Sequence, residues 1–199
     1  MFTGIIKHVA RFHGYRLNKQ ELVIEPPRDL LAGLKRGDSL AVNGVCLTVR
    51  SLGSGRASFD LSRETLDKTT LGSLAHADIL NVELPLTLSE PLSGHLVTGH
   101  VDTVGRIKRF YGRAAGKRME ISLDRGLLKF VVAKGSVAVN GVSLTVAGLG
   151  KNSFEVELIP LTLKWTNLGR LATGDAVNIE CDIIAKYVYN YILQKDKKY

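Results

Sequence analysis

A cysteine and a serine stand at the same place in two closely similar blocks of this sequence. Cys46 belongs to the block 40–49, and Ser143 belongs to the block 137–146. A thiol is partly ionised near neutral pH and is a good nucleophile, whereas a serine hydroxyl needs the help of a base. The two blocks therefore indicate two sites of polar chemistry with unequal reactivity. For Cys46 the alternative is a buried, small apolar side chain, the usual state of a lone cysteine.

A threonine follows each of these residues at a spacing of two. In an extended strand this spacing puts Thr48 on the same face as Cys46, and Thr145 on the same face as Ser143. Either threonine could simply be a strand residue, because threonine is common in strands. Since the pattern occurs twice, it favours two faces that contact a ligand.

Residues 1–184 carry an internal repeat. Gly44 and Gly141 lie 97 residues apart, and most of the unit keeps that spacing, whereas Thr3-Gly4 and Thr98-Gly99 lie 95 apart. Such self-similarity is the signature of a duplicated domain. The sequence predicts two like domains, residues 1–94 and 95–184, and a third piece, residues 185–199, that has no counterpart.

Short strands dominate each unit. Phe154, Val156 and Leu158 alternate with glutamates, as in a half-buried strand, and turns such as Asn43-Gly44 separate the runs. This pattern predicts a small antiparallel barrel in each domain. Short helices are expected over 161–168 and 65–71, each stopped by a glycine.

The chain end has a different period. Apolar residues at 184, 187, 188, 191 and 192 form the stripe of an amphipathic helix. Such a stripe either folds back on its own barrels or meets another copy of itself. The sequence leaves both alternatives open.

Composition narrows the class of protein. The 199 residues are 45% hydrophobic, which is enough for packed cores, and no apolar run approaches the roughly 20 residues of a membrane span. The N-terminus lacks the pattern of a signal peptide, so a cytoplasmic location and no membrane partner are expected. Cys46 and Cys181 form no Cys-x-x-Cys pair, so neither a disulfide framework nor a metal site is indicated.

The net charge of +8 raises the question of an anionic partner. The basic residues are scattered, apart from Lys195, Lys197 and Lys198, and a solvated surface with a charged tail explains them. A barrel that binds nucleic acid would carry aromatic residues between basic ones on a strand face. The sequence has no such cluster, so no nucleic-acid partner is expected.

Four segments together resemble the riboflavin synthase family, over the whole chain. They are Met1–Ile6, the two blocks described above, and Gly94–Val101. The resemblance implies an all-β fold of two tandem, similar, six-stranded antiparallel Greek-key barrels with a C-terminal α-helix at 185–199. It also implies a homotrimer held by those helices, with active sites between the first barrel of one subunit and the second barrel of its neighbour. Association with lumazine synthase is a further implied partnership.

The family's reaction defines the expected substrate. Two molecules of 6,7-dimethyl-8-ribityllumazine exchange a four-carbon unit and give riboflavin and 5-amino-6-ribitylamino-2,4(1H,3H)-pyrimidinedione. The pteridine ring delocalises charge itself, so no metal or other cofactor is expected. The alternative is a non-catalytic antenna protein that holds a lumazine or flavin. The presence of Cys46, Ser143 and Asp182 favours the enzyme.

The resemblance also implies which residues line the two lumazine pockets. On the first barrel they are Gly4, Ile5, Ile6, Cys46, Leu47, Thr48, Asp60, Leu61, Ser62, Arg63, Glu64 and Thr65. On the second barrel they are Gly99, His100, Val101, Lys134, Ser143, Leu144, Thr145, Ile159, Pro160, Leu161, Thr162, Leu163 and Lys164. Many relatives have a polar residue in place of Leu161, which puts a side-chain hydrogen bond there in doubt.

Four residues are expected to be catalytic: Cys46, His100, Ser143 and Asp182. Cys46 could add to C7 of a lumazine as a thiolate, or hold the ring by hydrogen bonding while water or hydroxide adds. Asp182 would orient a hydroxyl or assist proton transfer. His100 could act as an acid or base, or present only its backbone. Cys181 is expected to be structural.

Overall fold

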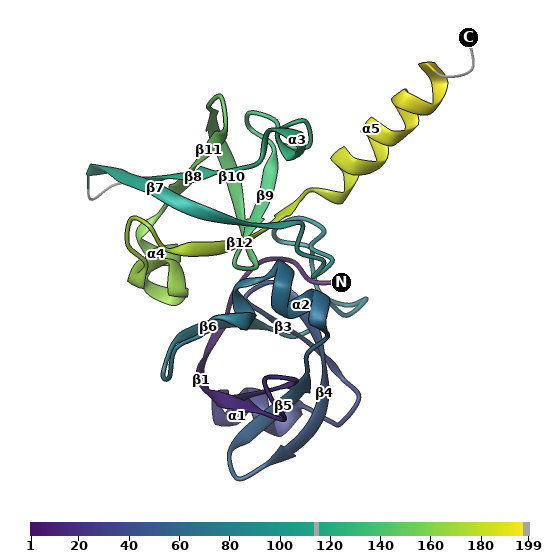
Figure 1. The fold of residues 1–199 in the computed structure, drawn as a ribbon, viewed down its shortest axis with the longest axis vertical. Helices are drawn as coiled ribbons and strands as arrows, with labels where there is room; N and C mark the ends of the chain where they lie inside the picture. Colours follow the sequence, from purple (N-terminus) through teal and green to yellow (C-terminus); the bar gives the residue numbers. More distant parts are fainter. Residues whose placement is uncertain (114–115, 197–199) are drawn as a thin grey trace.

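Two six-stranded antiparallel barrels and a protruding C-terminal helix make up the computed structural model, which describes residues 1–113 and 116–196 (Figure 1). The first barrel consists of β1 (His8–Arg16), β2 (Glu21–Glu25), β3 (Ser39–Val42), β4 (Val45–Gly53), β5 (Arg56–Asp60) and β6 (Ile79–Glu83). The second consists of β7 (Thr103–Arg113), β8 (Gly116–Ser122), β9 (Ser136–Val139), β10 (Val142–Leu149), β11 (Ser153–Leu158) and β12 (Ala176–Cys181).

Both barrels are closed and have the same Greek-key strand order. The first runs β1-β2-β5-β4-β3-β6, and the second repeats this order with β7 to β12. A closed barrel has no edge strand, so the first and last strands of each sheet pair with each other. The fold class predicted from the sequence is therefore confirmed.

The predicted alternation in the two repeated blocks is also confirmed. On β4, Val45, Leu47 and Val49 are buried in the first barrel's core, while Thr48 is exposed and Cys46 is half-buried. The equivalent residues of β10 alternate in the same way. Both polar pairs therefore lie on the outer faces of their barrels.

The two predicted helices, at 65–71 after β5 and at 161–168 after β11, are each broken in two. The first is split into α2 (Arg63–Lys68) and a 3-10 turn, η1 (Thr70–Gly72), and the second into α4 (Pro160–Trp165) and η2 (Asn167–Arg170). Thr69 causes the first break, because it has extended backbone and its hydroxyl both donates to the carbonyl of Thr65 and accepts from the amide of Leu71. Thr166 does the same in the second repeat. The sequence pattern did not predict these breaks. Two further short helices, α1 (Arg28–Gly33) and α3 (Arg125–Leu128), precede β3 and β9.

The segment before each barrel crosses to the other barrel. Phe2 and Val97 form an antiparallel bridge at the crossing. Ile6 is buried in the core of the second barrel, and Val101 packs against the core of the first. The two barrels therefore complete each other's cores.

A polar interface with approximate twofold symmetry joins the barrels. The side-chain amide of Asn81 donates to the carbonyl of Asn140 over 2.9 Å, and that of Asn178 donates to the carbonyl of Asn43 over 2.9 Å. The glycines that follow, Gly44 and Gly141, lie back to back. These residues occur in both repeats, so the duplication supplies both halves of the interface.

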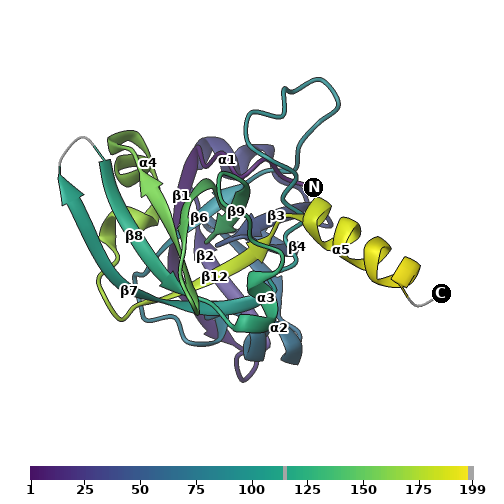
Figure 2. The same ribbon diagram turned by 90° about the horizontal axis from the view of Figure 1, so that it is seen from above.

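Helix α5 (Ile183–Asp196) projects away from the barrels (Figures 1 and 2). Its apolar stripe is exposed, with Tyr187 at 72% and Tyr191 at 60% of full exposure. Tyr189 lies off the stripe and contacts Phe130 of the second barrel, with the ring centroids 5.3 Å apart. The chain's own barrels therefore leave the stripe uncovered, which answers one question that the sequence left open. No helix in the described ranges is long and apolar enough to cross a membrane.

We predict that Gly44→Ala destabilises the fold far more than Gly55→Ala. Both glycines have positive φ, +77° and +76°, so alanine costs about 1 kcal/mol of backbone strain at either position. A Cβ on Gly44 would also lie 2.6 Å from the amide nitrogen of Gly141, whereas a Cβ on Gly55 meets no described heavy atom within 4 Å. The expected loss in unfolding free energy is about 3 kcal/mol or more for Gly44→Ala. Urea unfolding of both variants measures the difference, and equal losses would contradict the close packing.

Candidate functional site

Two crossed backbone hydrogen bonds bring the repeated polar residues to the opposite repeat. The amide of Cys46 donates to the carbonyl of Gly99 over 2.9 Å, and the amide of Ser143 donates to the carbonyl of Gly4 over 2.8 Å. The expected grouping of the pocket residues is therefore wrong in one respect. Within one chain, Gly4 and Ile6 lie with the second barrel, while Gly99 and Val101 lie with the first. The spacing of the repeat gave no sign of this exchange.

Only glycine fits at these two crossings. Gly99 has φ +85°, and a Cβ there would lie 2.5 Å from the Cβ of Cys46. Gly4 has φ +75°, and a Cβ there would lie 2.6 Å from the Cβ of Ser143. The bare backbone thus sits directly against each polar residue and leaves no room for a side chain.

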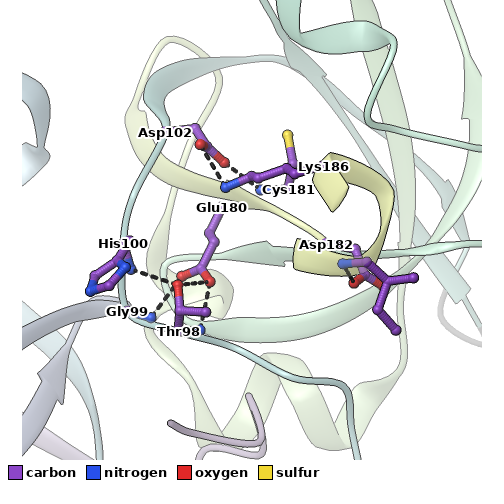
Figure 3. A network of polar contacts seen from close by, with 9 residues as sticks. Thr98, Gly99, His100, Asp102, Glu180, Cys181, Asp182 and Lys186 are labelled. Atoms are coloured by element: carbon purple, nitrogen blue, oxygen red, sulfur yellow. Dashed lines mark hydrogen bonds and ion pairs between the residues drawn. The ribbon is translucent and has the colours of Figure 1, made fainter. Parts of the chain in front are cut away.

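A buried glutamate holds each crossing segment in place. The carboxylate of Glu180 accepts hydrogen bonds from the amide and the hydroxyl of Thr98 at 2.6 and 2.7 Å, and from the amide of Gly99 at 2.9 Å (Figure 3). Glu83 binds Thr3 and Gly4 in the same way. Burial raises the pKa of both glutamates, and the hydrogen bonds from the threonines oppose the shift. Sequence reasoning missed their role, although their recurrence after Asn-x in both repeats was a usable signal.

A cavity of about 440 Å³ opens beside Cys46 on the outside of the first barrel. It gathers several expected residues and adds two arginines. Its polar lining consists of Arg36, Cys46, Thr48, Arg50, Asp60, Ser62 and Thr65. Arg50 pairs with Asp60, and Ser62 caps α2 by accepting a hydrogen bond from the amide of Thr65 over 3.0 Å. The cavity therefore offers hydroxyls, a thiol and charged groups to a polar small molecule.

The other expected pocket residues fall into two groups. Leu47, Leu61 and Leu144 are buried in the barrel cores, so only their backbones are available to a ligand. The remaining residues lie on the outer surface, exposed or half-buried: Ile5, Arg63, Glu64, His100, Lys134, Thr145, Ile159, Pro160, Leu161, Thr162, Leu163 and Lys164. Lys134 stands at the position of the cavity residue Gly37 and has positive φ of 66°.

His95 is a site residue that sequence reasoning missed. Its Nδ1 atom and the hydroxyl of Ser143 share a hydrogen bond of 2.7 Å, while its Nε2 atom is buried without a hydrogen-bond partner among the described residues. Burial lowers the pKa of His95, and the charge of Asp182 opposes that shift. A neutral imidazole in contact with a serine hydroxyl is the arrangement of a base and the group it activates. The available signal was the position of His95 in the segment Gly94–Val101, one of the four that carry the family resemblance.

Asp182 connects this group to the C-terminal helix. One of its carboxylate oxygens accepts a hydrogen bond from the amide of Ile184 over 2.9 Å, at the start of α5 (Figure 3). The same side chain is close enough to His95 to influence its charge state. Of the expected catalytic residues, Ser143 therefore contacts His95 directly, and Asp182 acts on it through its charge. The fourth expected residue, His100, has an exposed side chain, and its amide donates to the hydroxyl of Thr98 over 3.2 Å.

The two cysteines are unlike. Cys46 is half-buried at the edge of the cavity, whereas Cys181 is 1% exposed and burial raises its pKa to about 12. A thiol in that state is inert, so Cys181 has a structural role in β12. Within the described residues, no group of histidine, cysteine, aspartate and glutamate side chains is arranged to hold a metal ion.

The fold and the two matching sites define a protein with two lumazine-binding domains. The model of the lumazine binding domain family matches residues 3–85 and 98–182. In the solved structures, LumP complexed with riboflavin aligns with a TM-score of 0.84 at 23% identity, covering 91% of this chain and 99% of LumP. LumP complexed with 6,7-dimethyl-8-(1'-D-ribityl) lumazine aligns with a TM-score of 0.81 at 22% identity. At this level of identity these structures establish the shared fold.

Several riboflavin synthases are similar to this chain over most of its length. Riboflavin synthase of Mycobacterium tuberculosis (strain H37Rv) is 41% identical, over 94% of this chain and 96% of that protein. Riboflavin synthase of Actinobacillus pleuropneumoniae is 37% identical, over 98% of this chain and 91% of that protein. Riboflavin synthase of Escherichia coli K12 is 38% identical, over 92% of this chain and 87% of that protein. The chain belongs to the riboflavin synthase family.

We predict that His95→Gln reduces the dependence of stability on pH below about 6.5. The folded protein holds the pKa of His95 below its ordinary value of 6.5, so the unfolded chain takes up a proton first as the pH falls. His95 therefore favours folding above pH 6.5 and loses that contribution as the pH falls toward its lowered pKa, by at most about 1.4 kcal/mol per pH unit. Glutamine can keep the hydrogen bond to Ser143 but does not titrate. Urea unfolding from pH 7.5 to 5 checks this, and parallel curves for parent and variant would contradict it.

Proposed function

We propose that this protein converts two molecules of 6,7-dimethyl-8-ribityllumazine into riboflavin and 5-amino-6-ribitylamino-2,4(1H,3H)-pyrimidinedione. It is a transferase of the last step of riboflavin biosynthesis, as its relatives' names and its two lumazine-binding domains indicate. The observation that carries the proposal is the doubled outer face, with Cys46 and Thr48 on one barrel and Ser143 and Thr145 on the other. A reaction between two identical molecules needs two similar pockets, and the duplication supplies them.

Orienting the two lumazine molecules is the enzyme's largest task in such a reaction. One lumazine loses a proton from its C7 methyl group, the other accepts a nucleophile at C7, and their coupling gives an adduct that fragments into the two products. Effective molarities of about 10⁵ to 10⁸ M for well-oriented partners show how much positioning alone can contribute. The rigid barrel strands and the fixed backbone at Gly4 and Gly99 suit this task.

The Ser143 site is proposed to handle a proton. The neutral imidazole of His95 can accept a proton through the hydroxyl of Ser143, and Asp182 can stabilise the charge that then forms on His95. Burial makes this charge costly without Asp182. Together these contacts support a general base at the Ser143 site.

The Cys46 site is proposed to hold the second lumazine. Cys46 either adds to C7 as a thiolate or holds the ring while water or hydroxide adds, and both roles agree with its half-buried place at the cavity edge. The polar lining of the cavity, including Asp60 and Ser62, suits the hydroxyl groups of a ribityl chain. His100 remains a candidate for an acid, a base or a backbone contact.

A light-emission antenna is the second candidate function. The LumP structures establish that this fold occurs with a bound lumazine or riboflavin in another protein. The enzyme is favoured here because Cys46, Ser143 and Asp182 are all present, and because His95 adds a base to them.

Assembly as a homotrimer is part of the proposal. We propose that residues 1–94 and 95–184 are the two lumazine-binding units and that residues 185–199 form the trimerisation segment. The exposed stripe on α5, with Tyr187, Val188 and Tyr191 each more than half exposed, supports burial against other copies. Trimerisation would bring the first barrel of one subunit to the second barrel of its neighbour, where a shared site would form. A cytoplasmic location and association with lumazine synthase are proposed on the family resemblance alone.

The test of function uses the purified protein and the lumazine alone. We expect one riboflavin for every two lumazines consumed, with no added metal or nucleotide, because one lumazine gives its four-carbon unit to the other and leaves as the pyrimidinedione. Chromatography of the products measures this ratio. Tight binding of lumazine without any riboflavin would reject the enzyme and favour the antenna.

The test of assembly shortens the chain after Lys186. This truncation removes the exposed stripe from Tyr187 onward, and with it the contact of Tyr189 with Phe130, but it keeps Lys186 and its contact with Asp102. We expect a monomer in sedimentation, strongly reduced riboflavin formation, and barrels that remain folded in urea unfolding. A truncated monomer with the activity of the parent would rule out a site shared between subunits.

A further inference from the structure

A partly buried ion pair ties the first turn of α5 to the segment that reaches Cys46. The ammonium of Lys186 lies 2.7 Å from a carboxylate oxygen of Asp102, and the two side chains are only 20% and 19% exposed (Figure 3). The other carboxylate oxygen of Asp102 accepts a hydrogen bond from the amide of Cys181 over 2.8 Å. Asp102 therefore joins three elements: the crossing segment, strand β12 and helix α5.

Lys186 stands where a lysine is locally unfavourable. The first turn of a helix carries the positive end of the helix dipole, which disfavours a cation. Lys186 lies in that turn, and its amide donates to the carbonyl of Asp182 over 3.3 Å. The contact with Asp102 offsets this cost, so the position is explained by a tertiary contact and not by the helix itself.

The path from Asp102 to Cys46 is short and rigid. Residues 98–101 are fixed at one end by Glu180, which binds Thr98 and Gly99, and at the other end by Asp102. Between these anchors, Val101 packs against the first barrel's core, and the carbonyl of Gly99 accepts a hydrogen bond from the amide of Cys46. A shift of Asp102 would therefore move the backbone that lies against Cys46.

The other crossing is built differently. The residue that matches Asp102 in the first repeat is Lys7, which has the opposite charge and is exposed. The segment before it is bound by Glu83, as its counterpart is by Glu180, but a proline, Pro85, stands where Asp182 begins the helix in the second repeat. The ion pair that ties a crossing segment to a helix thus occurs at the Cys46 site, and Lys7 offers no counterpart to it at the Ser143 site.

We propose that Asp102 and Lys186 are positioning residues that hold residues 98–101 against Cys46, so that the docking of α5 on its own chain sets the geometry of the first-barrel site. Neither side chain lines the cavity beside Cys46. The proposal rests on the proposed function for its kinetic consequence, but its structural consequence can be measured on the protein without substrate.

The structural test follows the alkylation of Cys46 by iodoacetamide, with mass spectrometry to assign the modified cysteine. Cys181 is buried with a raised pKa, so it does not compete. Lys186→Met and Asp102→Asn should each raise the alkylation rate of Cys46 roughly three- to tenfold, because the backbone over the thiol loosens. Combining the two variants should add little further. Lys151→Met, on an exposed turn of the second barrel, is the matched control and should react at the parent rate.

The kinetic test uses the same variants with lumazine. A loosened Cys46 site should lower kcat several-fold with a much smaller change in KM, and the exchanged pair, Asp102→Lys with Lys186→Asp, should recover part of kcat. Sedimentation and urea unfolding show whether assembly and folding are kept. Asp102→Asn leaves Lys186 unpaired and could fail to fold for that reason. In that case the Lys186→Met variant tests the proposal, because Asp102 keeps its hydrogen bond from the Cys181 amide in that variant.

The outcomes separate this proposal from the proposed function. Parent-like alkylation in folded Lys186→Met, or effects of the two variants that simply add, would overturn the positioning pair even if the parent makes riboflavin. Absence of riboflavin from the parent, with alkylation changed as expected, would overturn the function and leave the pair in place.

Discussion

The crossed hydrogen bonds between Gly4 and Ser143 and between Gly99 and Cys46 are the contacts on which the rest of the molecule depends. Each bond connects the segment that opens one repeat to the central hairpin of the other repeat. Because Ile6 and Val101 follow these segments into the opposite cores, neither barrel is complete without its partner. The same bonds fix the backbone beside Cys46 and Ser143, so the contacts that join the barrels also position these two side chains.

A duplicated scaffold has become chemically asymmetric at these two places. Around Cys46 the neighbours are polar, with Arg36 and Ser62 lining a cavity. The residues that match these two in the second repeat are Ala133 and Ile159, and the polar partner there is His95, which arrives from the domain junction. Similar backbones thus carry unequal groups at the two sites. In the proposed reaction, the Cys46 site would hold a ring and the Ser143 site would move a proton.

The sequence predicted what depends on local pattern. Alternation at Val45, Leu47 and Val49 fixed which side chains enter the core, and the repeat fixed the number and likeness of the barrels. The sequence did not reveal the exchange of opening segments, because a spacing of 95 residues is compatible with either partner barrel. His95 and the two glutamates were missed for a related reason. Their partners lie about 48 to 82 residues away, and no periodicity encodes such contacts.

Buried titratable groups make the site sensitive to pH in opposite directions. The raised pKa of Glu180 favours the folded state at low pH, and this contribution is lost as the pH rises through that pKa. The lowered pKa of His95 favours the folded state above pH 6.5, and this contribution is lost as the pH falls. The two groups therefore make stability depend on pH with opposite signs.

The start of α5 is where these local features meet the proposed assembly. Asp182 caps the helix beside His95, and one turn later Lys186 binds Asp102 behind the Cys46 site. The same helix presents its apolar stripe outward, away from both contacts. In the proposed assembly, a force on the helix from a neighbouring subunit would therefore reach both sites through its first turn, by way of Asp182 and the partly buried pair of Lys186 and Asp102. If α5 joins subunits as proposed, this arrangement gives a physical reason for building it directly onto the last strand of the second barrel.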